Sequence, residues 1–151
     1  MPAFSRKKLK YEYVKHTADI EFFAYGKTLG ELFRNASMAM FNTIADTRAI
    51  ASLPSKTKIF RVAVSSHAPE DLLWKFLQRT FSIADSNYAF SYKVKAVSVK
   101  VGKERCSAKA TVCSKSSSSG VSMLDVKGVS KYDLHLTGAK GAFKASVVLD
   151  V

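Results

Sequence analysis

Three anionic groups near the two ends of the chain have the types and positions to do chemistry together. Asp19 closes a polar break, His16-Thr17-Ala18-Asp19, and Asp150 stands next to Val151, whose terminal carboxylate is the third group. If the fold brings these groups together, their like charges recruit a cation. Oxygen ligands suit a hard ion, Ca²⁺ or Mg²⁺, rather than zinc. The alternative is that Asp19 is an ordinary turn residue that hydrogen-bonds its own neighbours.

No recognised catalytic motif accompanies these carboxylates. The sequence lacks a phosphate-binding glycine loop, a Gly-x-Ser-x-Gly elbow and a His-Glu-x-x-His helix. Its three histidines, His16, His67 and His135, are scattered and do not suggest a nucleophile with its base. A metal-dependent hydrolase would have to use His16 as general base near Asp19, and this reading ranks last because nothing positions a nucleophile.

Basic residues offer a second kind of function. Lys and Arg total 24 against 12 acidic residues, a formal net charge of +12, and such a balance favours polyanions such as RNA, DNA or an acidic protein surface. The cations concentrate in residues 6–15, 93–115 and 127–144. Tyr88, Phe90 and Tyr92 could stack on bases beside the second cluster, or could pack as strand aromatics on a helix.

Two helices are expected to position these groups. Thr28 and Glu31 have capping-box spacing and predict a helix that ends near Asp46. A second helix is expected to open at Pro69, a residue favoured in the first helical turn. Apolar residues at helical spacing predict the buried faces of both helices: Leu29, Leu32, Phe33, Ala36, Met40 and Ile44 in the first, and Leu72, Leu73, Phe76, Leu77, Phe81 and Ala84 in the second. Trp74 falls outside the second stripe.

Period-two patterns predict strands over most of the remaining sequence. The expected strands are 11–14, 20–25, 59–64, two strands of a hairpin that turns at Gly102–Arg105, and then 124–130, 132–136 and 143–151, with a solvated loop at 114–120. The apolar face of the last strand runs to Val151, so its carboxylate is expected to lie against the body of the protein. The element order predicts an α+β fold in which two helices pack on an antiparallel or mixed sheet.

Length and composition are consistent with this architecture. The chain has 151 residues, of which 47% are apolar, which excludes disordered and collagen-like classes. We expect a flexible basic arm at residues 1–10 and a single domain at 11–151. No apolar run is long enough to span a membrane, and no secretory signal is visible. Cys106 and Cys113, seven apart in a predicted strand, should face opposite sides and stay unbridged, as in an intracellular protein.

Several segments together resemble the archease family, over nearly the whole chain. They are Tyr11-Glu12-Tyr13-Val14-Lys15-His16-Thr17-Ala18-Asp19-Ile20, Ala24-Tyr25-Gly26-Lys27-Thr28-Leu29, Ala36-Ser37-Met38-Ala39-Met40-Phe41, Asp71-Leu72-Leu73-Trp74, Val126-Lys127-Gly128-Val129-Ser130 and Val147-Val148-Leu149-Asp150-Val151. The combination of His-Thr-Ala-Asp with the terminal Leu-Asp-Val is quite specific.

The resemblance implies a fold, a partner and a metal site. It implies strand–helix–strand–strand (SHS2-like) units in a protein that is not itself an enzyme. Such a protein activates the RtcB-type RNA ligase of tRNA splicing, by promoting GTP-dependent guanylylation of the ligase and its multiple turnover. It also implies a bound divalent metal, commonly Ca²⁺, whose ligands map onto Asp19, Asp150 and Val151. The competing hypothesis is a basic RNA-binding module that acts without a ligase partner.

Overall fold

The computed structural model describes residues 9–14, 19–118 and 120–151. The expected basic arm at 1–10 lies almost wholly outside the described residues, as does His16. No helix in the described part of the chain is long and apolar enough to cross a membrane.

The described residues form an α+β fold, as predicted, and every strand pair among them is antiparallel. The elements in chain order are β1 (Tyr11–Val14), β2 (Ile20–Gly26), α1 (Leu29–Ile44), α2 (Thr47–Ser52), β3 (Lys58–Ser66), α3 (Pro69–Ser86), β4 (Ala89–Val101), β5 (Cys106–Ser116), β6 (Gly128–Val129), β7 (His135–Ala139) and β8 (Ala142–Asp150).

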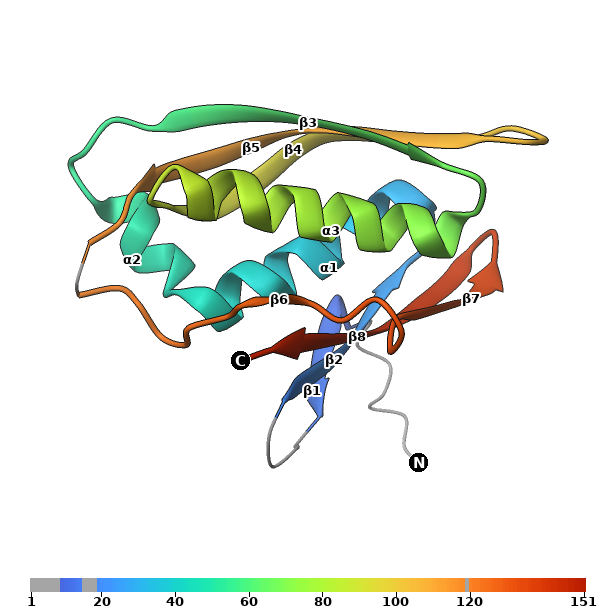
Figure 1. The fold of residues 1–151 in the computed structure, drawn as a ribbon, viewed down its shortest axis with the longest axis horizontal. Helices are drawn as coiled ribbons and strands as arrows, with labels where there is room; N and C mark the ends of the chain where they lie inside the picture. The colour runs from blue at the N-terminus through green and yellow to red at the C-terminus, as the bar shows by residue number, and fades with distance from the viewer. Residues whose placement is uncertain (1–8, 15–18, 119) are drawn as a thin grey trace.

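These strands make two sheets, whereas the sequence suggested one shared sheet. The first sheet has the order β1-β2-β8-β6, with β7 also paired to β8, and the second has the order β3-β5-β4. The helices lie between the two sheets (Figure 1): α1 packs against both β2 and β4, and α3 packs against β3 and β6. Each sheet therefore has one face on the helical layer and one face directed away from it.

The start of α1 follows the predicted capping box. The Thr28 hydroxyl accepts a hydrogen bond from the Glu31 backbone N–H at 3.1 Å, and the Glu31 carboxylate accepts one from the Lys27 N–H, also at 3.1 Å. Gly26 lies just before this cap, where a Cβ would run into the backbone of Leu32. The tight passage from β2 into α1 therefore requires glycine at this position.

Helix α3 opens at Pro69, as predicted, and the face that carries Leu72 and Phe76 is fully buried. The Asp71 carboxylate accepts a hydrogen bond from the Ser66 hydroxyl at the end of β3. This bond, assisted by nearby lysines, lowers the pKa of Asp71 from its ordinary value. Trp74 is half-buried, and its Nε1–H donates to the Val129 carbonyl at 2.8 Å, which ties α3 to β6.

Several boundaries differ from the predictions. Helix α1 ends at Ile44, because Asp46 caps a further short helix, α2, by accepting from two backbone N–H groups. Of the strand expected at 124–130, only Gly128–Val129 pairs, and β7 starts three residues later than expected. The expected loop at 114–120 gives three residues to β5, which continues to Ser116.

Candidate metal centre

The register between β2 and β8 brings the two predicted aspartates to adjacent positions. Ile20 pairs with Leu149, and continuing the antiparallel register by one residue sets Asp19 opposite Asp150. In an antiparallel pair, directly opposite side chains have Cβ atoms about 4.5–5.5 Å apart. On its other side, Asp150 pairs with Gly128 of β6, and its carbonyl accepts from the Lys127 N–H at 2.7 Å.

Both aspartates belong to the outward face of the first sheet. Leu149 is fully buried against the helices, so strand alternation directs Asp150 to the opposite side, and both Asp19 and Asp150 are exposed. Glu21 shares this face two residues after Asp19, and it accepts a hydrogen bond from Ser146 Oγ at 3.0 Å. The sequence interpretation overlooked Glu21, although the period-two pattern of β2 places it beside Asp19.

The terminal residue is less enclosed than expected. β8 ends at Asp150, and Val151 is 37% exposed rather than buried with the rest of its strand face. Within the described residues, no group of three or more His, Cys, Asp or Glu side chains is placed to hold a metal. The ligand set that the family resemblance implies, Asp19, Asp150 and the Val151 carboxylate, consists of carboxylates alone, and such a donor set suits a hard cation.

Aromatic and charged side chains continue this outward face along β1, β2 and β8. Lys144 Nζ lies 4.2 Å from the centroid of the Phe23 ring and 6.0 Å from that of Tyr25. The Tyr25 hydroxyl donates to the Glu12 carboxylate at 3.0 Å, and partial burial together with this bond raises the pKa of Tyr25. The half-buried rings of Phe23 and Tyr25 add apolar surface to the face that carries the two aspartates.

The histidines and cysteines form no second centre among the described residues. His67 Nδ1 lies 3.2 Å from the Glu104 carbonyl at the exposed end of the second sheet, whereas His135 is exposed on β7 of the first sheet. Cys106 and Cys113 are both buried and unbridged, as predicted. Burial raises the pKa of the Cys106 thiol, which makes it a poor nucleophile.

Comparison with known proteins then identifies the family. The family model of the Archease protein family matches residues 11–151. The chain belongs to the archease family. It is 32% identical to the protein archease of Methanosarcina mazei over 144 residues, which cover 94% of this chain and 96% of that relative. It is 29% identical to the protein archease of Methanothermobacter thermautotrophicus over 142 residues, 93% of this chain and 98% of that one.

A solved archease-like structure shares the fold. The solution structure of Methanobacterium thermoautotrophicum protein 1598 superimposes with a TM-score of 0.78 at 30% sequence identity, covering 94% of this chain and 99% of that one. The two-sheet arrangement around the helical layer is therefore an archease fold.

Proposed function

We propose that this archease-family chain is a non-enzymatic activator of an RtcB-type RNA ligase in tRNA splicing, and that it works with a bound divalent cation. Family membership over residues 11–151 supports the partner and the process. The β2–β8 register supports the cation, because the pairing of Ile20 with Leu149, continued by one residue, would set Asp19 opposite Asp150 on an exposed face. This register, which joins two distant parts of the sequence, is the observation on which the proposal rests.

Asp19, Asp150 and the Val151 carboxylate would hold the ion, with Ca²⁺ the expected metal and Mg²⁺ the alternative. When bound, the ion supplies positive charge that offsets the repulsion between these carboxylates. The chain's own contribution is to hold the aspartates in register, through the β2–β8 ladder and the Lys127 bond to the Asp150 carbonyl. Activation follows if the protein binds the guanylylation-competent state of the ligase more tightly than its other states.

The test combines a metal readout with a turnover readout. Ligase, GTP and RNA halves are mixed with this protein, and the ligations per ligase molecule are counted; Ca²⁺ binding is measured by calorimetry. We expect Asp19→Asn to abolish Ca²⁺ binding and to reduce turnover to that of ligase alone. Glu104→Gln, an exposed acid in the β4–β5 hairpin, is the control and should change neither. No gain in turnover from the unsubstituted protein would reject the activator role.

The outward face of the second sheet supports RNA binding as a second candidate function. Strands β3, β4 and β5 contain no Asp or Glu, and their outward positions carry five cations: Arg61, Lys93, Lys95, Lys100 and Lys109. The one ion pair observed in the described part of the chain joins Lys75 to Asp71, so none of the five is neutralised in this way. Ser and Thr hydroxyls between them are further phosphate ligands.

Salt dependence and charge reversal distinguish this function from ligase activation. If the face neutralises about four phosphates of a single strand, log Kd should change with log salt with a slope of about 3. Lys109→Glu should lower both the affinity for a fluorescent RNA and this slope, whereas Arg48→Glu, a matched reversal on α2, should do so less. RNA affinity that survives Asp19→Asn supports direct binding; affinity that is absent at low salt rejects it.

A further inference from the structure

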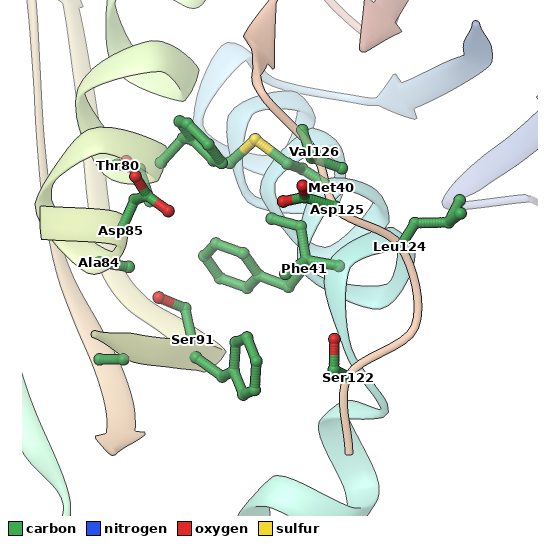
Figure 2. A pocket seen from close by; sticks show the side chains of 14 residues that line it. Met40, Phe41, Thr80, Ala84, Asp85, Ser91, Ser122, Leu124, Asp125 and Val126 are labelled. Atoms are coloured by element: carbon green, nitrogen blue, oxygen red, sulfur yellow. The ribbon is translucent and has the colours of Figure 1, made fainter. Parts of the chain in front are cut away.

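A cavity of about 260 Å³ lies away from both outward faces, between the two long helices. Its walls come from the last turns of α1, the last turns of α3, the start of β4 and residues 122–126 (Figure 2). None of the predicted metal ligands borders it.

Three phenylalanine rings line this cavity: Phe41 from α1, Phe81 from α3 and Phe90 from β4. Phe41 is 2% exposed, and Met40 beside it is fully buried. Aromatic faces carry partial negative charge and attract cations, so rings gathered around a space form a familiar kind of site for organic ammonium ions. The walls therefore favour an apolar ligand and tolerate a positive charge.

A buried hydroxyl in the wall has no partner of its own. Thr80 is 2% exposed, and its Oγ1 makes no hydrogen bond to any described residue. Buried polar atoms are nearly always paired, and one left unpaired in a cavity wall is a candidate ligand contact.

Two carboxylates border the same space. Asp85 and Asp125 are both exposed, and Figure 2 shows Asp85 on the α3 side, near Thr80, with Asp125 across from it on the 122–126 segment. Neither carboxylate has a hydrogen-bond or ion-pair partner within the residues that the structure describes. The whole chain has a net charge of +12, whereas these two unneutralised acids make the charge at this cavity locally negative.

We propose that this cavity binds a primary organic ammonium ion with an apolar body. The body would lie among the three rings, and the ammonium would donate to Thr80 Oγ1 and to the carboxylates of Asp85 and Asp125. A cavity of 150 Å³ accepts benzene, so the observed volume suits about nine or ten non-hydrogen atoms. The ammonium could belong to a free amine or to a lysine side chain of another protein. This site is independent of the proposed ligase activation.

Phenethylamine, titrated into ¹⁵N-labelled full-length protein and followed by NMR, tests the proposal. We expect saturable shifts at backbone amides around the cavity, with a dissociation constant of about 1 mM. 3-Phenylpropionate has the same ring with the opposite charge and should bind at least tenfold more weakly. Nα-acetyl-lysine amide, titrated in parallel, identifies the source: tighter binding than phenethylamine indicates a lysine side chain, and weaker binding indicates a free amine.

Single substitutions test whether the two carboxylates and the Thr80 hydroxyl contact the amine. Asp85→Asn and Asp125→Asn should each weaken phenethylamine binding about fivefold, while Asp133→Asn, a surface acid outside the cavity, should not. Thr80→Val should weaken binding by a similar factor without unfolding the protein, and Thr80→Ser should restore it. Equal affinity for the amine and the carboxylate, or binding unchanged in Asp85→Asn, Asp125→Asn and Thr80→Val alike, would overturn the proposal, as would the absence of cavity shifts at 20 mM amine.

Discussion

Replacing Lys115 by Met should destabilise the protein markedly, although the substitution keeps an unbranched side chain that is only one atom shorter. Lys115 is 6% exposed in β5, and its Nζ donates to the carbonyls of Ala51 at 3.0 Å and Leu53 at 2.7 Å. Both carbonyls belong to the end of α2, where backbone acceptors have no partner within the helix. The ammonium also lies 5.5 Å from the centroid of the Tyr92 ring. Lys115 therefore fastens α2 to the second sheet.

The expected loss follows from these contacts. A hydrogen bond to a charged group contributes about 1.5–3 kcal/mol. The Ala51 carbonyl belongs to an exposed residue and can accept a hydrogen bond from water when the ammonium is removed. Leu53 is half-buried, so its carbonyl recovers less hydrogen bonding from water. We therefore expect one bond to be lost in full, a decrease of about 2 kcal/mol in the free energy of unfolding. With a urea m-value of about 2 kcal/mol/M, this lowers the denaturation midpoint by about 1 M.

Urea denaturation followed by circular dichroism measures this difference. Lys95→Met is the control, because Lys95 is an exposed lysine on β4 of the same sheet and its replacement should change stability by less than about 0.5 kcal/mol. If Lys115→Met also fell within that margin, the lysine would not be capping α2 in solution and the reasoning would fail.

Three further outcomes follow from other contacts. Because the pKa of Asp71 is lowered in the fold, the stabilising contribution of this carboxylate is complete above about pH 4 and is lost as the pH falls through its pKa in the folded protein. Asp71→Asn should therefore flatten the fall in melting temperature between about pH 5 and 2. An unchanged slope would contradict this. Cys106 and Cys113 should react with Ellman's reagent only after unfolding, and rapid modification of two thiols in the native protein would show that they are not buried. Gly26→Ala should lower the free energy of unfolding, measured by urea denaturation, by about 2–3 kcal/mol. Gly30→Ala, at a position where a Cβ has room, should be neutral or stabilising. Equal effects of the two substitutions would argue against the tight turn at Gly26.

The fold class was predictable because local and periodic signals agree over the long elements. Each long helix is predicted by independent local signals: a start signal, which is the Thr28 cap or Pro69, and an apolar stripe at helical spacing. The structure confirms both helices. Short elements were not predictable in the same way. Helix α2 has six residues, and the carbonyls at its end accept hydrogen bonds from Lys115, which is 62 residues away from Leu53 in the sequence. Sequence periodicity cannot report a capping group supplied from that distance.

The candidate metal residues were predicted from residue type, but their proximity comes from the strand register. Chain order alone does not say that β8 pairs with β2 rather than with β7 alone, or at which offset. A shift by one residue would have turned Asp150 toward the helices and Leu149 toward solvent. The fully buried Leu149 excludes that shift, so burial of the apolar face keeps Asp150 on the outward face, and the observed pairing of Ile20 with Leu149 sets the offset along the strands.

The layer order has a consequence for the two candidate functions. Because the helices lie between the sheets, the outward face with Asp19 and the outward face with Lys109 point in opposite directions (Figure 1). A ligase bound at the first face would leave the second free to contact RNA, and residues that share no partner contribute independently. If both functions operate, Lys109→Glu should therefore weaken RNA binding by the same factor in the Asp19→Asn background as in the unsubstituted protein. A smaller effect of Lys109→Glu on RNA affinity in the Asp19→Asn background would mean that the two faces are coupled.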